Sequence, residues 1–423
     1  MAITVSSVAS TCERAREASR ALARTDTATK NAALLAIAAA LRERTEEILV
    51  TNERDLVAGR EADIGAALLD RLRLDAGRIE GIAQAVEAVA QLPDPVGEVI
   101  DGHRLPNGLD VRKVRVPLGV IAIVYEARPN VTIDAAALCL KSGNAIVLRG
   151  SSSAEHSNAV LSSIAAEAAV GAGLPAGCIG LVAGGGRGEL AELATQDGLV
   201  DLLIPRGGEG LKAALKEVAS VPVIYAASGN CHVYVDASAD LDDALAIVLN
   251  AKTQRPGVCN AAETLLVHAD VAPVFLPRAL VALNGAGVES RVDERAAEHA
   301  GQAAALTAPA SEEDWDTEYL ALTLAVAVVD SLAEAIEHVA LHGSGHSEAI
   351  VTKDTVSARE FQLGVDAACV YVNASTRFTD GGEFGMGAEI GNSTQKLHAR
   401  GPIGLRELCT SKYLVEGAGH VRV

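Results

Sequence analysis

One cysteine lies in a stretch of chain that favours a sharp turn. Cys259 follows Pro256 and Gly257 in the segment QRPGVCN, where neither a regular helix nor a regular strand can continue. Most cysteines are buried and unreactive, whereas a reactive thiolate needs positive charge nearby. Lys252 and Arg255 lie close in sequence and favour the thiolate. The residues alone leave two interpretations: a nucleophile, or a small apolar side chain at a turn.

Two other segments have the composition of phosphate-binding loops. Gly207 and Gly208 follow an apolar strand and precede the amphipathic segment EGLKAALKEVA. Glycines let the backbone approach a phosphate, and a helix N-terminus supplies N–H groups, but Gly-Gly before a helix is also an ordinary turn. Arg149 ends another strand ahead of Ser151 and Ser152. This set can hold a ribose 2′-phosphate, and the serines can equally be helix caps.

The composition is that of a globular protein with an acidic surface. Of the 423 residues 49% are hydrophobic, and 55 Asp+Glu against 36 Lys+Arg give a formal net charge of -19. This balance argues against a nucleic-acid partner or an anionic membrane surface, so an acidic ligand needs a local basic pocket. The seven cysteines have no CxxC pair and no metal-ligand spacing, which favours reduced thiols in a cytoplasmic protein without a metal. The sequence begins without the order of a secretory signal, and no apolar run approaches the roughly 18 residues of a membrane span.

The pattern along the chain predicts the elements that carry these residues. Residues 7–90 repeat apolar positions at spacings of three and four, which is typical of helices. Residues 101–117 favour a hairpin that turns at Pro106, Asn107 and Gly108. From residue 118 onward apolar strands alternate with helices, and the alternation begins again after residue 235. We therefore predict an α/β fold with two doubly wound parallel sheets.

Several long segments resemble the aldehyde dehydrogenase superfamily. These segments occur in the order and approximate spacing of that superfamily over nearly the whole chain, and they read PLGVIAIVYEARPN, IPRGGEGL, GNCHVYVDASADLDDA and QRPGVCNAAETLLVH. The forms VYEARPNVT and TRFTDGGEFGMGAEIGNSTQKLHARGPIGL are similar to its gamma-glutamyl phosphate reductase branch. The resemblance implies an NADPH-binding domain at 1–100 and 118–235, a catalytic domain at 236–380, and a small β oligomerisation arm from 101–117 and 405–423.

The resemblance also implies a reaction. We expect the NADPH-dependent reduction of L-glutamate 5-phosphate to L-glutamate 5-semialdehyde and phosphate, the second step of proline biosynthesis, through a thioacyl intermediate on Cys259. The substrate is strongly anionic, so cationic side chains must gather at the site. Arg255, Lys252 and Arg128 are the candidates, and each can instead be a solvated surface charge.

The cofactor and partners follow from the same resemblance. Arg149, Ser151 and Ser152 match the adenosine-ribose contacts of NADP-using relatives, and Gly207 and Gly208 take the pyrophosphate by their loop position. We expect a homo-oligomer that needs no metal. A transient contact with glutamate 5-kinase is a further hypothesis, because acyl phosphates are unstable.

Two positions depart from the superfamily pattern. Ala226 falls where relatives have the glutamate that activates water, so hydrolysis of a thioester should be slow. Glu126 falls where relatives have an oxyanion-stabilising asparagine, so the oxyanion donor is either Asn130 or a backbone N–H near Cys259. Ala226 argues against the alternative of a hydrolytic NAD(P)-dependent semialdehyde dehydrogenase, and the intact RPGVC segment argues against a non-enzymatic protein.

Overall fold

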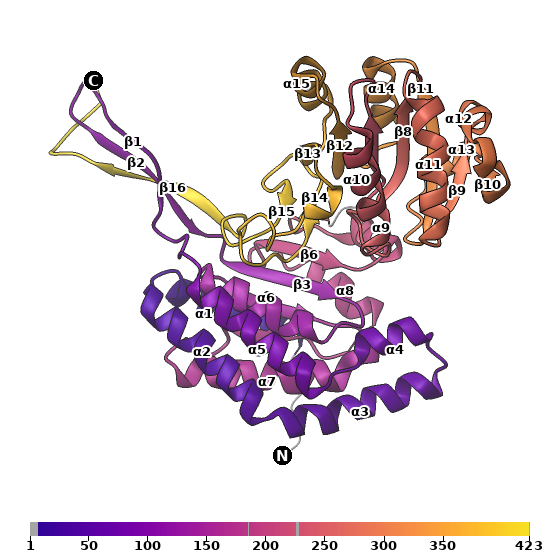
Figure 1. Cartoon of the computed structure of the whole chain (residues 1–423). Coiled ribbons are helices and arrows are strands. Elements are labelled where there is room, and N and C mark those ends of the chain that lie inside the picture. Colours follow the sequence, from indigo (N-terminus) through magenta and orange to yellow (C-terminus); the bar gives the residue numbers. More distant parts are fainter. Residues whose placement is uncertain (1–6, 185, 226–227, 423) are drawn as a thin grey trace. The chain divides into compact units, whose positions relative to one another are not determined.

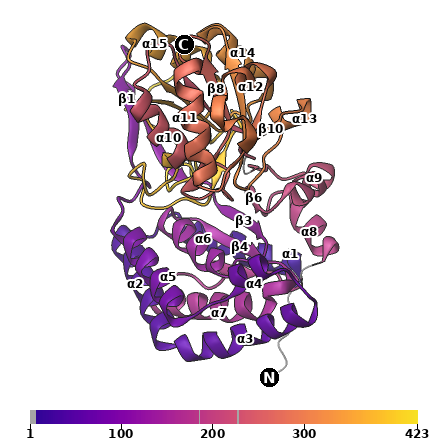
Figure 2. The ribbon, with the colours of Figure 1, turned by 45° about the vertical axis from the view of Figure 1, so that its right-hand side comes forward.

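The computed structural model describes residues 7–184, 186–225 and 228–422 (Figure 1, Figure 2). They divide into two compact units. Unit 1 contains Met1–Tyr225, Gly385–Gly391 and Ile403–Val423, and unit 2 contains Ala226–Phe384 and Asn392–Pro402. The C-terminal tail therefore contributes residues to both units.

Five helices open unit 1, as the apolar spacing predicts. They are α1 (Val8–Leu22), α2 (Thr27–Glu43), α3 (Thr45–Glu61), α4 (Ala66–Leu72) and α5 (Ala76–Gln91). The side chains of Ser7, Asp26 and Asp75 cap α1, α2 and α5 by accepting a backbone N–H. Helix α2 buries positions three and four residues apart, such as Leu34, Ile37 and Leu41, and packs against α5 and α7.

Unit 1 contains a parallel four-stranded sheet in the order β5-β4-β3-β6. Its strands are β3 (Val120–Tyr125), β4 (Ala145–Arg149), β5 (Ile179–Leu181) and β6 (Leu202–Arg206). The connecting helices are α6 (Asn130–Lys141), η1 (Ser152–Ala154), α7 (Glu155–Gly171), α8 (Arg187–Ala194) and α9 (Glu209–Val218). The strand order reverses between β3 and β6, and ligands of open α/β sheets bind beyond the carboxyl ends of strands at such a point.

A second, antiparallel sheet of unit 1 joins segments far apart in sequence. Its strands are β1 (Val99–Arg104), β2 (Asp110–Pro117) and β16 (Cys409–Glu416), in the order β1-β2-β16. Strand β2 pairs with β1 as a hairpin and with β16 on its other side (Figure 1). The chain turns at Gly108, whose φ of 95° lies in the region that glycine adopts without strain.

Unit 2 is built on a seven-stranded parallel sheet in the order β10-β9-β11-β8-β7-β12-β13. The strands are β7 (Cys231–Val235), β8 (Ala262–His268), β9 (Glu289–Val292), β10 (Thr307–Pro309), β11 (Thr323–Val329), β12 (Ser347–Val351) and β13 (Cys369–Val372). The helices are α10 (Leu241–Thr253), α11 (Ala272–Gly285), α12 (Glu294–His299), η2 (Gly301–Leu306), α13 (Glu312–Trp315), α14 (Leu332–His342), α15 (Thr355–Gly364) and η3 (Thr376–Phe378). A small pair, β14 (Asn392–Ser393) and β15 (Gly401–Pro402), completes the unit.

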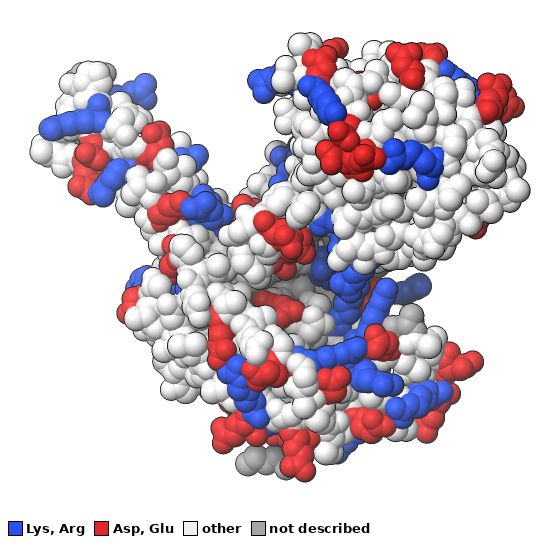
Figure 3. All heavy atoms as spheres, viewed as in Figure 1, with Lys and Arg blue, Asp and Glu red and all other residues white. Residues whose placement is uncertain are grey.

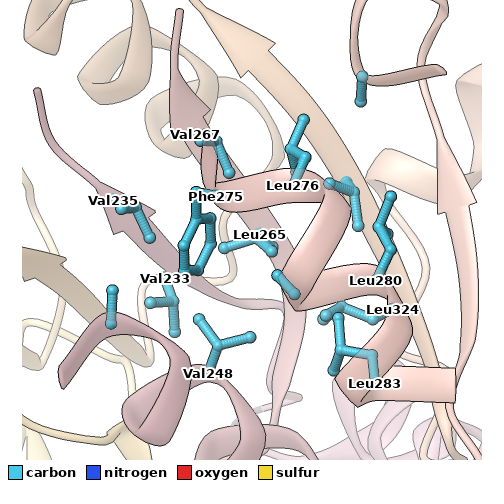
Figure 4. Close-up of a cluster of buried hydrophobic side chains, with 14 of the residues drawn as sticks. Val233, Val235, Val248, Leu265, Val267, Phe275, Leu276, Leu280, Leu283 and Leu324 are labelled. Atoms are coloured by element: carbon cyan, nitrogen blue, oxygen red, sulfur yellow. The ribbon is translucent and has the colours of Figure 1, made fainter. Parts of the chain in front are cut away.

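Alternate residues of these strands fill the cores on the two faces of the sheet. Val233 and Leu265 belong to the cluster that packs with Phe275 of α11 (Figure 4), whereas Tyr234 belongs to a second cluster with Phe361 of α15. Helices on both faces of a parallel sheet confirm the predicted doubly wound α/β fold.

Strand β7 corrects one predicted boundary. The sequence analysis placed residues up to 235 in the first domain, but β7 pairs with β8 and β12 in the sheet of unit 2. The division between the units falls instead between Tyr225 and Ala226.

Among the described helices, none combines the length and the apolar character that crossing a membrane requires.

Candidate active site

Cys259 lies in the turn between α10 and β8. Pro256 and Gly257 are turn residues, and the N–H of Ala261 donates to the carbonyl oxygen of Val258 (3.0 Å), so the chain bends just before β8. The side chain of Cys259 is half-buried. The predicted nucleophile therefore lies just before β8, a central strand of the unit 2 sheet, and none of the seven cysteines, all of them within the described ranges, forms a disulfide.

The backbone of Cys259 packs closely against the segment that leads into β7. The Cys231 thiol donates to the carbonyl oxygen of Cys259 (3.2 Å). A Cβ atom added at Gly229 would lie 1.4 Å from this same oxygen, so the position accepts glycine and nothing larger. The N–H of Gly229 donates to Glu318 Oε1 (2.7 Å), which holds the segment in place. The sequence analysis did not single out Gly229, although it lies in a segment quoted for the resemblance.

The residue after the cysteine holds the η3 segment. Asn260 Nδ2 donates to the carbonyl oxygens of Arg377 (3.3 Å) and Thr379 (2.9 Å), and Thr376 Oγ1 donates to the carbonyl oxygen of Asn260 (2.7 Å). These three bonds bring Arg377 to the loop that carries Cys259. Arg377 is not among the predicted site residues, because its segment follows a different strand, β13.

Two predicted substrate cations differ in their surroundings. Arg255 is exposed in the Cys259 loop, as expected for a side chain that meets an anion from solvent. Lys252 is fully buried, and its Nζ donates to Glu263 Oε2 (2.5 Å). Burial lowers the pKa of Lys252 and raises the pKa of Glu263 to about 7. The prediction that Lys252 holds a substrate anion is therefore wrong, and its partner is Glu263, to which the sequence analysis gave no role.

The segment after β3 carries a predicted substrate cation, Arg128, and the predicted oxyanion donor, Asn130, and it belongs to unit 1. Arg128 is exposed there. Asn130 begins α6, and its Nδ2 donates to Asp134 Oδ2 (2.8 Å) one turn along the helix. Burial raises the pKa of Asp134 to about 6. One amide N–H of the predicted oxyanion donor is thus engaged within its own helix.

Glu126 lies beside the predicted pyrophosphate loop. The loop connects β6 to α9, and Gly208 is the N-cap residue of that helix. The N–H of Gly208 donates to Glu126 Oε2 (3.4 Å), and a Cβ atom at Gly207 would lie 2.8 Å from Glu126 Cδ. The start of α9 therefore presents the N–H group of Gly208 to a carboxyl oxygen, and a helix N-terminus of this kind can also meet a phosphate oxygen.

The predicted ribose contacts lie at the carboxyl end of β4. Arg149 is buried, and its Nη2 donates to the carbonyl oxygen of Gly186 (2.7 Å). Burial lowers its pKa, while the carboxylates of Glu189 and Glu126 raise it. Ser151 Oγ accepts the N–H of Ala127 (3.2 Å), and Ser152 is exposed.

These cofactor candidates share one edge of the unit 1 sheet. Arg149 pairs with Val124 of β3, and Arg206 at the end of β6 pairs with Tyr125 of β3. The segments that carry Arg149 and Gly207 therefore leave the sheet on either side of β3, where the strand order reverses.

The structure bears only indirectly on the expectations about Ala226 and about a metal. Ala226, on which the argument about water attack depends, lies outside the described residues. Within the described ranges, His, Cys, Asp and Glu side chains form no group of three or more that can hold a metal ion.

Comparison with known proteins finds one family by sequence and by structure. The model of the aldehyde dehydrogenase family matches residues 1–308. The chain is 57% identical over 410 residues to gamma-glutamyl phosphate reductase of Thermobifida fusca, covering 97% of each protein, and equally similar to that of Moorella thermoacetica. The crystal structure of gamma-glutamyl phosphate reductase from Thermotoga maritima is 47% identical, with a TM-score of 0.96 over 98% of this chain and 100% of that one. An acetylating aldehyde dehydrogenase from Geobacillus thermoglucosidasius, at 20% identity and a TM-score of 0.69, shares the fold.

Proposed function

Because the chain belongs to the gamma-glutamyl phosphate reductases of the aldehyde dehydrogenase family, we propose that it reduces L-glutamate 5-phosphate to L-glutamate 5-semialdehyde and phosphate. In the cytoplasm, where thiols stay reduced, this reaction is the second step of proline biosynthesis from glutamate. The observation that carries the proposal is the placement of Cys259, half-buried in a turn whose backbone is fixed against Gly229 and whose surroundings are cationic.

Cys259 acts in this proposal as a thiolate nucleophile. Its sulfur attacks the acyl carbon, a C–S bond forms, and the bond from that carbon to the phosphate oxygen breaks, so phosphate leaves as a stable anion. When bound, NADPH would supply the hydride for reduction of the resulting thioester. The thiohemiacetal oxygen then re-forms the C=O bond and expels the Cys259 thiolate, which releases the aldehyde. Asn130 donates to the oxyanion with its second amide N–H, and Arg255 and Arg128 hold the anionic groups of the substrate.

We assign NADPH to the carboxyl ends of β4 and β6. The residues there fit the cofactor: Arg149 and the hydroxyl groups of Ser151 and Ser152 suit a ribose 2′-phosphate. At Gly208, the N-cap residue of α9, an added Cβ atom would meet nothing within 4 Å, and the N–H groups at the start of this helix suit a pyrophosphate. We therefore expect turnover with NADPH to exceed turnover with NADH.

The proposal predicts that Cys259→Ala abolishes reduction without loss of cofactor binding. Glutamate 5-phosphate is generated in the assay by a glutamate kinase, and NADPH and NADH oxidation are followed by absorbance. We expect turnover below about one ten-thousandth of the native rate, because no other group forms the thioester. NADPH affinity, measured by fluorescence titration, should change less than about twofold, since the cofactor candidates lie in unit 1.

Cys369→Ala is the matched control, because Cys369 is also half-buried and lies in unit 2. It should keep turnover near the native rate. Native-like turnover in Cys259→Ala would contradict the proposed nucleophile.

We further propose that the β1-β2-β16 sheet is an oligomerisation arm. Strand β16 is an edge strand that exposes Tyr413 (65%) and Val415 (55%). Exposed apolar edge strands pair readily with another chain. Charged side chains of both signs lie along the same sheet (Figure 3). Arg112 of β2 forms an ion pair with Glu416 of β16. This mixture of charges suits pairing with a second copy of the chain.

The arm proposal predicts that the double variant Tyr413→Asp/Val415→Asp lowers the mass of the particle. The two carboxylates would carry charge into the edge that pairs, so the oligomer should dissociate to smaller species in sedimentation velocity. Leu341→Asp on α14 is the control, because Leu341 is also 70% exposed and lies in the other unit. An unchanged mass in the double variant would exclude β16 from the interface.

A transient contact with the kinase that makes the labile substrate completes the proposal. Cys259→Ala protein in excess should then slow the coupled kinase and reductase reaction by competing for the kinase. An unchanged coupled rate would count against direct transfer.

A further inference from the structure

The turn that carries Arg377 is fixed to the Cys259 loop at both its backbone and its side chain. Asn260 shares the three hydrogen bonds described above with the side chain of Thr376 and the carbonyl oxygens of Arg377 and Thr379. In addition, Arg377 Nε donates to Gln254 Oε1 (2.9 Å), and Gln254 precedes Arg255. Arg377 is therefore held against the same short loop from two directions.

The guanidinium group of Arg377 donates to the amide oxygen of Gln254. Among the described residues, neither Arg377 nor Arg255 forms an ion pair with a carboxylate. Asp380, the nearest acidic residue in sequence, uses Oδ1 to accept the N–H groups of Gly382 and Glu383. Other arginines of unit 2, such as Arg291 and Arg295, do pair with carboxylates.

The pKa of Arg377 responds to charges that lie near its guanidinium group. Burial and then the charge of Arg255 lower the pKa of Arg377, while the charges of Cys259 and Asp380 raise it. Two like charges near one another are unfavourable, and a half-buried guanidinium adds a desolvation cost. An anion bound by both guanidinium groups would offset the repulsion between them and the desolvation cost of Arg377.

The position of Arg377 and Arg255 near the Cys259 thiol indicates which anionic group of the substrate they would bind. In an acyl phosphate the dianionic phosphoryl group is attached to the carbon that the thiol attacks, whereas the carboxylate of the amino acid lies several bonds away. Cations on the loop of the nucleophile therefore meet the phosphoryl group first. Arginine suits this ligand, because its fork of N–H donors matches phosphate oxygens.

We propose that Arg377, together with Arg255, binds the phosphoryl group of the acyl phosphate and, in the reverse direction, inorganic phosphate. This inference rests on the proposed function and adds a residue to it. As the C–O bond breaks, negative charge grows on the departing phosphate, and the guanidinium groups stabilise that charge where it forms. In the reverse direction they hold phosphate for attack on the thioester.

The test varies phosphate in the oxidation of glutamate 5-semialdehyde by NADP. Arg377→Ala should raise the KM for phosphate about 10–100-fold, the range expected when one charge-assisted pair of hydrogen bonds is lost. Arg377→Lys should recover part of the loss. The KM values for the semialdehyde and for NADP should stay within about twofold, and Arg359→Ala, an exposed arginine of α15, should match the native protein.

A second readout needs no turnover. Phosphate should protect Cys259 from alkylation by iodoacetamide in the native protein, and this protection should be lost in Arg377→Ala and weakened in Arg255→Ala. If the Arg377→Ala chain fails to fold by circular dichroism, Arg377→Gln and Arg255→Ala provide the same comparison.

Three results would overturn the inference. A rise in the KM for the semialdehyde alone would mean that Arg377 holds the carboxylate. Slower alkylation of Cys259 without phosphate, with an unchanged KM for phosphate, would mean that Arg377 only favours the thiolate. Full phosphate protection in Arg377→Ala would exclude the contact. Failure of the proposed function itself is distinguishable, because the native protein would then lack phosphate-dependent turnover while the alkylation experiment still reports on phosphate binding.

Discussion

Replacing Gly229 with alanine is expected to lower kcat/KM at least about a hundredfold while the seven-stranded sheet stays intact. A Cβ atom at this position would lie 1.4 Å from the carbonyl oxygen of Cys259 and 2.3 Å from its carbonyl carbon. Both are backbone atoms, so the Cys259 loop itself must move. A displacement of about 1 Å of a reacting group costs on the order of a hundredfold in rate. Steady-state kinetics measure the fall in kcat/KM, and circular dichroism shows whether the fold stays intact.

Gly257→Ala is a matched control within the same loop. The nearest neighbouring atom to a Cβ there is the carbonyl oxygen of Leu320 at 3.7 Å, an ordinary contact distance. We expect this variant to keep activity within about threefold. Native-like kinetics in Gly229→Ala would show that the backbone of the nucleophile tolerates displacement, and the structural account of the site would then fail.

The second large effect is on stability, at the buried pair of Lys252 and Glu263. Glu263→Leu leaves an ammonium group buried without its carboxylate, and breaking a buried pair in this way costs about 3–5 kcal/mol. The double variant Lys252→Met/Glu263→Leu replaces both charges by apolar groups. It should recover most of that loss, because an apolar pair of similar volume avoids the desolvation of two ions. Urea denaturation of the native, single and double variants measures the difference.

The pair also predicts a pH dependence of stability. The folded-state pKa of Glu263, about 7, lies above its ordinary value of 4.5, so the folded protein binds more protons than the unfolded chain between these two values. The free energy of unfolding should therefore fall as the pH rises from about 4.5 to 7 through the contribution of this group. The double variant should lack that contribution. A single variant as stable as the double one, or identical pH slopes, would contradict the assignment.

The sequence predicted the turn at Cys259 and both parallel sheets because these depend on local signals. Pro256 and Gly257 interrupt regular structure wherever they occur together, and buried strands appear as continuous apolar runs. The boundary at β7 was misplaced because one parallel strand carries no mark of the sheet to which it belongs.

The burial of Lys252 has a signal in the sequence of its helix. The buried positions of α10 are Ala244, Val248, Ala251 and Lys252, which share one helix face. A lysine on that face is expected to be buried and to need an acidic partner, and Glu263 lies in an apolar strand run. Arg377 offered no comparable signal, because its approach to Cys259 depends on hydrogen bonds from Asn260 between distant segments.

The most direct measurement runs the reaction backwards with the native protein. Glutamate 5-semialdehyde, in equilibrium with its cyclic imine, is mixed with NADP and phosphate is raised from zero, while reduced nicotinamide is followed by absorbance. The account predicts a rate that rises with phosphate, saturates, and is absent without it, because phosphate resolves the thioester on Cys259. A full rate without phosphate would mean that water resolves the thioester, and the protein would then be a hydrolytic semialdehyde dehydrogenase.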